Sequence, residues 1–214
     1  MSQSHGTGKV FKFVWLVILM RNGVRILSYL MAAFLIVFFG YFIVQGNYEF
    51  SGYAIVAAIL FYGLLWSDKH YNFPTITLWL VAIWIAMHLF GGSVYIGGVK
   101  LYDLMLLNLF NGGGEFVILK YDQFVHAYCY VAFAAIIYFM LKKHMKKGQE
   151  VALVIFTILA AIGVGLLNEV IEFAMVVFAD AAEAVGGYYN TALDLVFNLI
   201  GAIIGAIMAW KWLD

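Results

Sequence analysis

Charged residues are scarce in this chain of 214 residues. Asp, Glu, Lys and Arg make up 11% of it, whereas hydrophobic residues make up 65%. A water-soluble domain carries about 25% charged residues, because water must wet its surface. The composition therefore excludes an ordinary soluble domain and indicates a protein that lives in lipid. The length suits one domain, and no shift in composition along the chain marks a second.

Cysteine and proline are also rare, with one residue of each. Because Cys129 is alone, an internal disulfide is excluded, and within its apolar run it is interpreted as a small buried side chain. The single Pro and the six Trp agree with a membrane protein, since aromatic rings gather at membrane interfaces. Twelve basic and twelve acidic residues cancel, so the charge gives no indication of a nucleic-acid partner.

Long apolar runs are what the chain has in abundance. A helix rises about 1.5 Å per residue, so about 20 apolar residues cross the hydrocarbon core of a bilayer. We expect the third run to begin near Tyr71 and the fifth, which is long, to tilt or to extend beyond the core. The fold class is thus all-α, a polytopic bundle of about six transmembrane helices, at Ile26–Val44, Tyr48–Trp66, Thr75–Phe90, Phe124–Leu141, Val151–Phe178 and Ala192–Trp212.

Basic residues predict how these spans are oriented. With the N-terminus inside, two basic residues fall outside, Lys100 and Lys120, against ten inside: Lys9, Lys12, Arg21, Arg25, Lys69, Lys142, Lys143, Lys146, Lys147 and Lys211. This excess on one side predicts that both termini are cytoplasmic.

The same pattern divides the chain into regions. Residues 1–25 are interpreted as a cytoplasmic or interfacial segment. Residues 26–214 form a single transmembrane helical domain with an extracytoplasmic loop at 91–121. Within that loop Leu101–Phe110 is too short to span, and we expect an interfacial or re-entrant helix there.

Ionisable side chains inside the spans gather at their outer ends. Because such residues are costly in a membrane, each is a functional hypothesis by default. Spacings of three or four residues place neighbours on one helix face, as for Asp122 with His126 and Asp194 with Asn198. The ionisable residues, together with the polar ones beside them, are His88 on span three, Asp122 and His126 on span four, Asn168, Glu169 and Glu172 on span five, and Asn190, Thr191, Asp194 and Asn198 on span six.

Four carboxylates at one depth repel each other, so shared protons, a bound cation or salt bridges must compensate. No Lys or Arg lies in these spans at that depth, which favours protonation or a metal. Carboxylate with imidazole suits Zn, Mn or Fe, whereas carboxylate with amide suits Mg or Ca. Structural roles compete with this interpretation: His88 is a common kind of interfacial histidine, Asn168 and Asn198 could bond helix to helix, and Gly201 with Gly205 has the spacing of a helix-packing motif.

Three segments carry a resemblance to a known family. They are His88-Leu-Phe-Gly-Gly-Ser-Val-Tyr95, Tyr121-Asp-Gln-Phe-Val-His126, and the combination of Asn168-Glu-Val-Ile-Glu172 with Asn190-Thr-Ala-Leu-Asp194 and Asn198-Leu-Ile-Gly201. Over roughly residues 50–212 the chain resembles the YjdF-type family of bacterial and archaeal membrane proteins of unknown function, which is distantly similar to VanZ-like proteins. Asn190 stands where that family often has Asp, and Ala127 where it often has Phe. The first departure removes a carboxylate from that position.

The function ranked first is a metal-dependent hydrolase or transferase acting on a lipid or lipid-linked substrate at the outer leaflet. A divalent ion (Zn, Mn, Fe or Mg), or a carboxylate whose pKa is raised by burial, would activate water. Glu169 and Glu172 would serve as ligand and general base, His126 and Asp194 as ligands with His88 a further candidate, and Asp122 would orient His126. Tyr95, Asn168, Asn190, Thr191 and Asn198 would give polar support, and Gly112–Gly114 could form a lid.

Two other functions stay open. An accessory or structural subunit of a membrane complex, bound to another membrane protein or to a second copy, ranks second, because the polar cluster could be a hydrogen-bonded core. An ion- or proton-coupled carrier ranks third, since the polar groups stop in the outer half of the spans and no inverted repeat is evident. In each case we expect a multi-pass protein of a bacterial or archaeal cytoplasmic membrane, in contact with lipid and without a nucleic-acid partner.

Overall fold

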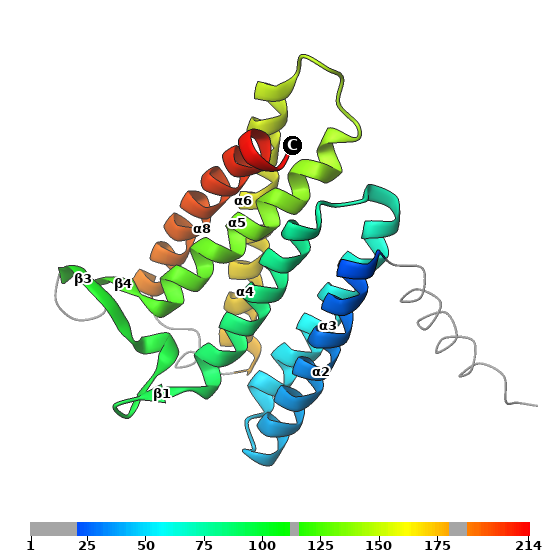
Figure 1. The fold of residues 1–214 in the computed structure, drawn as a ribbon. Coiled ribbons are helices and arrows are strands. Elements are labelled where there is room, and N and C mark those ends of the chain that lie inside the picture. Colours follow the sequence, from blue (N-terminus) through cyan, green and yellow to red (C-terminus); the bar gives the residue numbers. More distant parts are fainter. Residues whose placement is uncertain (1–20, 112–115, 180–187) are drawn as a thin grey trace, which may run out of the picture. The chain divides into compact units, whose positions relative to one another are not determined.

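The computed structural model describes residues 21–111, 116–179 and 188–214. Six of its helices are long and apolar enough to cross a membrane, which confirms the predicted multi-pass helical fold (Figure 1). They are α2 (Asn22–Val44), α3 (Tyr48–Tyr71), α4 (Thr75–Ser93), α5 (Tyr121–Lys142), α6 (Glu150–Ala179) and α8 (Tyr188–Met208), the last continuing into the π-helical turn η2 (Ala209–Leu213).

The third span begins at Thr75, so its expected start near Tyr71 is wrong. Tyr71 is the last residue of α3, and Asn72 ends that helix in the left-handed conformation with φ of 51°. Its N–H donates to Asp68 O at 2.7 Å, a helix ending that asparagine tolerates better than most residues. Pro74 follows, and since proline restricts the residue before it to extended conformations, the next helix starts only after it.

The chain forms two compact units, residues 1–82 and 83–214, which are described separately. In the first unit α2 packs against α3. At one end of this pair Asn47 caps α3 by accepting from Phe50 N at 3.1 Å. At the other end Arg21 contacts the buried Asp68 at 3.0 Å and donates to Phe73 O at 2.6 Å. This ion pair ties the start of α2 to the end of α3.

In the second unit α5, α6 and α8 pack against one another, as the ribbon in Figure 1 shows. The closest approach is between α5 and α8. A Cβ atom added at Gly201 would overlap the carbonyl oxygen of Ala127, and one added at Gly205 would overlap that of Val131. The two glycines therefore let the helix backbones touch, which is the use expected of small residues four apart in a membrane.

At the far end of this unit the C-terminal turn is bonded to α5. Tyr138 donates its hydroxyl to Asp214 Oδ2 at 2.8 Å, and Lys142 forms an ion pair with the same carboxylate. The basic residues Lys142 to Lys147 follow directly, at the end of α5 opposite to Asp122. The predicted orientation of the spans, and with it the cytoplasmic location of the termini, stays a prediction.

The loop between α4 and α5 consists of strands, so the helix expected at Leu101–Phe110 is wrong. It contains β1 (Tyr95–Ile96), β2 (Val99–Lys100), the 3₁₀ turn η1 (Leu101–Asp103), β3 (Met105–Asn111) and β4 (Val117–Lys120). β1 pairs with β2 and β3 with β4, both antiparallel. An isolated helix of about ten residues is marginal, whereas β4 offers this segment a partner for its backbone hydrogen bonds.

Some predictions fall outside the described residues. The proposed lid at Gly112–Gly114 is one, and the interfacial segment is described only from Arg21 onward. The interpretation of residues 26–214 as a single domain stays a prediction.

The contact between α5 and α8 can be tested by adding one methyl group. We expect Gly201→Ala to destabilise the protein by about 1–3 kcal/mol, the usual cost of overpacking, and to lower its melting temperature in detergent. The matched control is Gly163→Ala on α6, where an added Cβ meets no atom within 4 Å. Equal melting temperatures for the two variants would show that the close approach is not real.

Candidate functional site

Two carboxylates and one imidazole come together where α5 and α8 begin. Asp122 and His126 lie on the first two turns of α5, and Asp194 lies on the second turn of α8. His126 Nε2 is 3.6 Å from Asp122 Oδ1 and 4.0 Å from Asp194 Oδ1. One ligand atom from each residue lies within 4.8 Å of the other two. We call these three residues the Asp–His–Asp cluster.

Two amides of α8 orient the cluster. Asn198 Oδ1 lies 3.1 Å from His126 Nδ1, and Asn190 Nδ2 donates to Asp194 Oδ2 at 2.8 Å. An amide oxygen only accepts hydrogen bonds, so His126 Nδ1 carries the proton that it donates to Asn198. The Nε2 atom of a neutral His126 then presents a lone pair toward Asp122 and Asp194. Three acceptor atoms thus face one another, an arrangement that a proton or a cation stabilises.

Glu169 of α6 is the buried carboxylate next to this cluster. Its side chain is 6% exposed, and neither carboxylate oxygen makes a hydrogen bond within the described residues. Asp122, His126, Asn168 and Asn198 are near enough to interact with it electrostatically. Asn198 is itself buried, and its amide oxygen faces His126, whereas its amide nitrogen has no hydrogen-bond partner among the described residues.

The first turn of α5 is held in place by hydrogen bonds to β4, to the end of η1 and to α4. The fully buried Gln123 donates to Val117 O at 2.9 Å and accepts from Lys120 N at 3.1 Å. Tyr121 donates its N–H to Leu104 O at 2.9 Å and its hydroxyl to Met87 O at 3.0 Å. Sequence reasoning missed Gln123, although a Gln three residues after a helix start is a known capping signal.

His88 lies apart from the Asp–His–Asp cluster. Its Nδ1 forms a short hydrogen bond with the hydroxyl of Tyr102, a residue of η1, and its ring packs against Trp84. Gly91, one turn along α4, leaves the space that the Tyr102 ring fills. Sequence reasoning missed Tyr102, because nothing in the sequence pairs a loop tyrosine with this histidine. The role of His88 as a metal ligand stays a prediction.

The remaining predicted residues are placed as follows. Tyr95 is an exposed residue of β1, at 63% of its surface. Asn168 is half-buried on α6, and Thr191 is half-buried on the first turn of α8. Glu172 lies on α6, but its side chain is outside the described part of the structure. The residues brought together are thus Asp122, His126, Asp194, Asn190 and Asn198, with Glu169 beside them.

The orientation of His126 gives a direct test. We expect nitrogen NMR of the protein in nanodiscs to find the Nδ1-protonated form of His126. In Asn198→Leu, which removes the acceptor, the proton should move in part to Nε2, where Asp122 can accept it. Tyr138→Phe, which removes a hydroxyl group at the other end of α5, should leave the protonation of the His126 ring unchanged. An Nε2-protonated wild-type ring would contradict this geometry.

Comparison with known proteins identifies the family. A family model described as "Predicted membrane protein (DUF2238)" matches residues 26–214. No curated protein and no solved structure matches the chain. The match confirms the resemblance to a membrane family of unknown function, whereas the more distant similarity to VanZ-like proteins stays a prediction. With the family model covering almost all of the described spans, this chain belongs to the DUF2238 family of membrane proteins.

Proposed function

We propose that this protein is a divalent-metal-dependent enzyme that acts within the membrane on a lipid or lipid-linked substrate, as a hydrolase or transferase. The observation that carries the proposal is the Asp–His–Asp cluster, in which Asp122, His126 and Asp194 converge between two spans. The residues would hold the ion, and the ion would activate a water molecule or polarise the substrate.

The donor set and its spacing support a metal. Two ligand atoms on one Zn²⁺ are each about 2.0–2.2 Å from it, so they lie at most about 4.4 Å apart. The two distances from His126 Nε2, 3.6 and 4.0 Å, are within that range and are too long for hydrogen bonds. Oxygen and imidazole donors together suit Zn, Mn or Fe. The hydrogen bond that His126 donates to Asn198 and the one that Asn190 donates to Asp194 are the kind of support that orients metal ligands.

Glu169 is the best candidate for a general base. It is buried without a hydrogen bond of its own in the described residues, so its oxygens are available to take a proton. It also lies outside the group of atoms that could share one ion. A base must be within reach of the proton that it removes, directly or through one water. The electrostatic interaction of Glu169 with Asp122 and His126 supports such a position beside the cluster.

The location supports a membrane substrate. Asp122, His126 and Asp194 belong to helices long and apolar enough to span the bilayer, and their side chains are buried or half-buried. A substrate reaches such a position most directly from the lipid phase. The distribution of basic residues supports the outer leaflet as the location of this end of the spans. The membrane that we propose is a bacterial or archaeal cytoplasmic membrane.

A scaffold is the main competing function. The same hydrogen bonds, with the glycine contact of α5 and α8, would also serve to fix the helices of an accessory subunit. A carrier is less well supported. Toward the other end of α5, α6 and α8, the buried polar groups that the structure describes include Thr157 and the hydroxyl of Tyr138, which is bonded to Asp214. A continuous polar path is not evident among the described residues.

Metal content separates these functions. We expect elemental analysis of the purified protein to find about one divalent ion per chain. His126→Gln and Asp194→Asn should lose it, because each removes one of three donors. Glu169→Gln should keep the ion and lose activity if Glu169 is the base, whereas loss of the ion would make it a ligand. Asp103→Asn, which changes an exposed acidic residue of η1, is the control.

The readout for activity is the lipid composition of cells that express the wild type or a variant. We expect His126→Gln and Glu169→Gln to abolish any change that the wild type produces. A metal-free wild type whose cluster variants retain full biological activity would reject the enzyme and favour the scaffold.

A further inference from the structure

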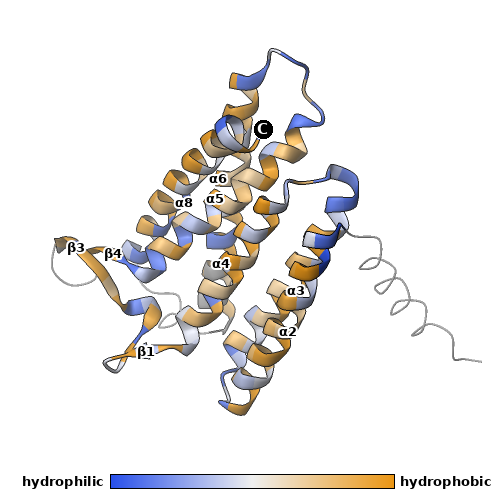
Figure 2. Cartoon of the chain, viewed as in Figure 1, coloured by the Kyte–Doolittle hydropathy of each residue, from blue (hydrophilic) through white to orange (hydrophobic). Residues whose placement is uncertain are grey.

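The β3–β4 hairpin exposes apolar side chains to an unusual extent. Five of the seven residues of β3 are large, hydrophobic and exposed, at 38–65% of their surfaces: Met105, Leu106, Leu107, Leu109 and Phe110. Figure 2 shows β3 as hydrophobic along almost its whole length. Successive side chains of a strand point to opposite sides, so neither side of this strand is polar.

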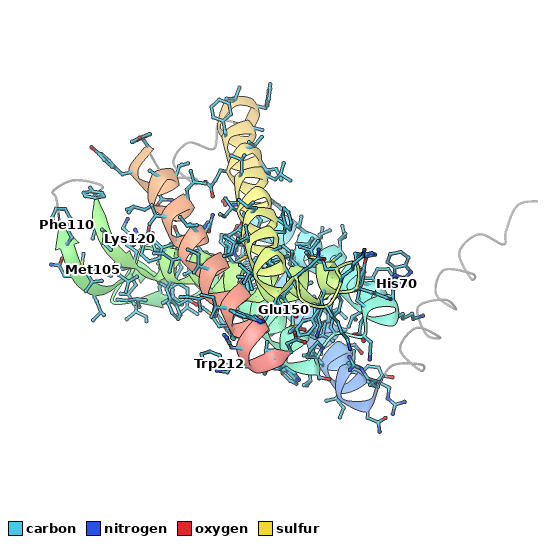
Figure 3. All side chains as sticks on the ribbon, turned by 90° about the horizontal axis from the view of Figure 1, so that it is seen from above. His70, Met105, Phe110, Lys120, Glu150 and Trp212 are labelled. Atoms are coloured by element: carbon cyan, nitrogen blue, oxygen red, sulfur yellow. The ribbon has the colours of Figure 1, made fainter. Side chains whose placement is uncertain are left out.

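The hairpin extends away from the helices of its own unit. In Figure 1 the hairpin leaves the end at which α5 and α8 begin, and Figure 3 labels Met105, Phe110 and Lys120 on it. Met105 and Lys120 pair at its base, and Phe110 pairs with Ile118 nearer its tip. β3 contains no charged residue, and Lys120 is the one charge on β4. An apolar ribbon of this kind is unfavourable in water, because burial of apolar surface contributes about 25 cal/mol per Å².

The hairpin is joined at both ends to membrane spans, which brings it close to lipid. It belongs to the segment that joins the end of the span α4 to the start of the span α5, so it lies where those two helices meet the membrane surface. Its aromatic contacts lead on to a third span: the ring of Phe116 is 5.3 Å from that of Phe110 and 5.3 Å from that of Tyr189, the second residue of α8. The exposed apolar surface of the spans therefore continues onto the hairpin.

The backbone of β3 limits how deep the hairpin can lie in the membrane. Its register with β4 jumps between Met105, which pairs with Lys120, and Phe110, which pairs with Ile118. Five steps along β3 correspond to two along β4, so β3 residues between these pairs are not matched one to one. Open strand edges do not occur in the hydrocarbon core, where no group can satisfy them. Headgroups and water can do so at the boundary, where amphipathic helices lie about 5–10 Å deep.

From these observations we propose that the β3–β4 hairpin is a lipid-binding element that lies in the interface of the leaflet at this end of the spans, with the side chains of β3 among the upper acyl chains. The occupant of its apolar surface is phospholipid. This inference concerns membrane contact alone and does not rest on a metal or a reaction at the Asp–His–Asp cluster.

The experiment measures where a spin label on the hairpin sits in a bilayer. The single cysteine, the buried Cys129, is replaced by Ala, and Leu109→Cys is labelled in phospholipid nanodiscs. Collision with oxygen, which concentrates in lipid, is compared with collision with an aqueous nickel chelate. Leu107→Cys is a second position should the first variant fail to fold. The controls are Lys147→Cys in the exposed loop after α5 and Leu159→Cys on the exposed face of α6.

We expect the ratio of oxygen to nickel collisions at Leu109 and Leu107 to be several-fold higher than at Lys147 and lower than at Leu159. A ratio equal to that at Lys147 would mean that the hairpin lies in water and would overturn the proposal. Protection from both reagents would mean that another protein or a second copy covers the strand. That result would also overturn the proposal. Metal content measured on the same preparations tests the proposed enzyme separately.

Discussion

The direct contact of two helix backbones determines most of what surrounds the candidate site. Gly201 and Gly205 lie against the carbonyl oxygens of Ala127 and Val131, and no other residue type fits there without displacing a helix. Because α5 carries Asp122 and His126 and α8 carries Asp194 and Asn198, this contact sets the distance across which they interact. In lipid, where apolar side chains gain little by leaving the solvent, close packing and interhelical hydrogen bonds are what hold helices together. On α5 and α8 the two glycines supply the close packing, and the polar cluster supplies the hydrogen bonds between helices.

The spans were predictable from sequence because a bilayer imposes its thickness on any helix that crosses it. The cluster was predictable in part for a related reason. Spacings of four placed Asp122 with His126 and Asp194 with Asn198, and these pairs do share helix faces in the structure. The sequence could not tell which helices are neighbours, since spacing within one helix says nothing about its partner. Gly201 and Gly205 hinted at a contact, but Ala127 and Val131 contribute to it only through their backbones.

The loop between α4 and α5 was predicted least well. A run such as Leu101–Phe110 reads equally well as helix or strand by hydrophobicity, and its strand state depends on pairing with Val117–Lys120 across the glycines. The same limit explains why Tyr102 and Gln123 were missed. Each owes its importance to a partner that folding brings near: His88 for the tyrosine, and the Val117 carbonyl for the glutamine.

Gln123 has a mechanical consequence as well. It binds the hairpin on one side and forms part of the first turn of α5 on the other, one residue from Asp122. The end of β4 and the first turn of α5 are therefore joined by hydrogen bonds. With the hairpin in the membrane interface, as proposed, a change in the thickness or lateral pressure of the leaflet that tilts the hairpin would be passed to the start of α5 and would shift Asp122 relative to Asp194. The shape of the cluster would then respond to the physical state of the surrounding lipid.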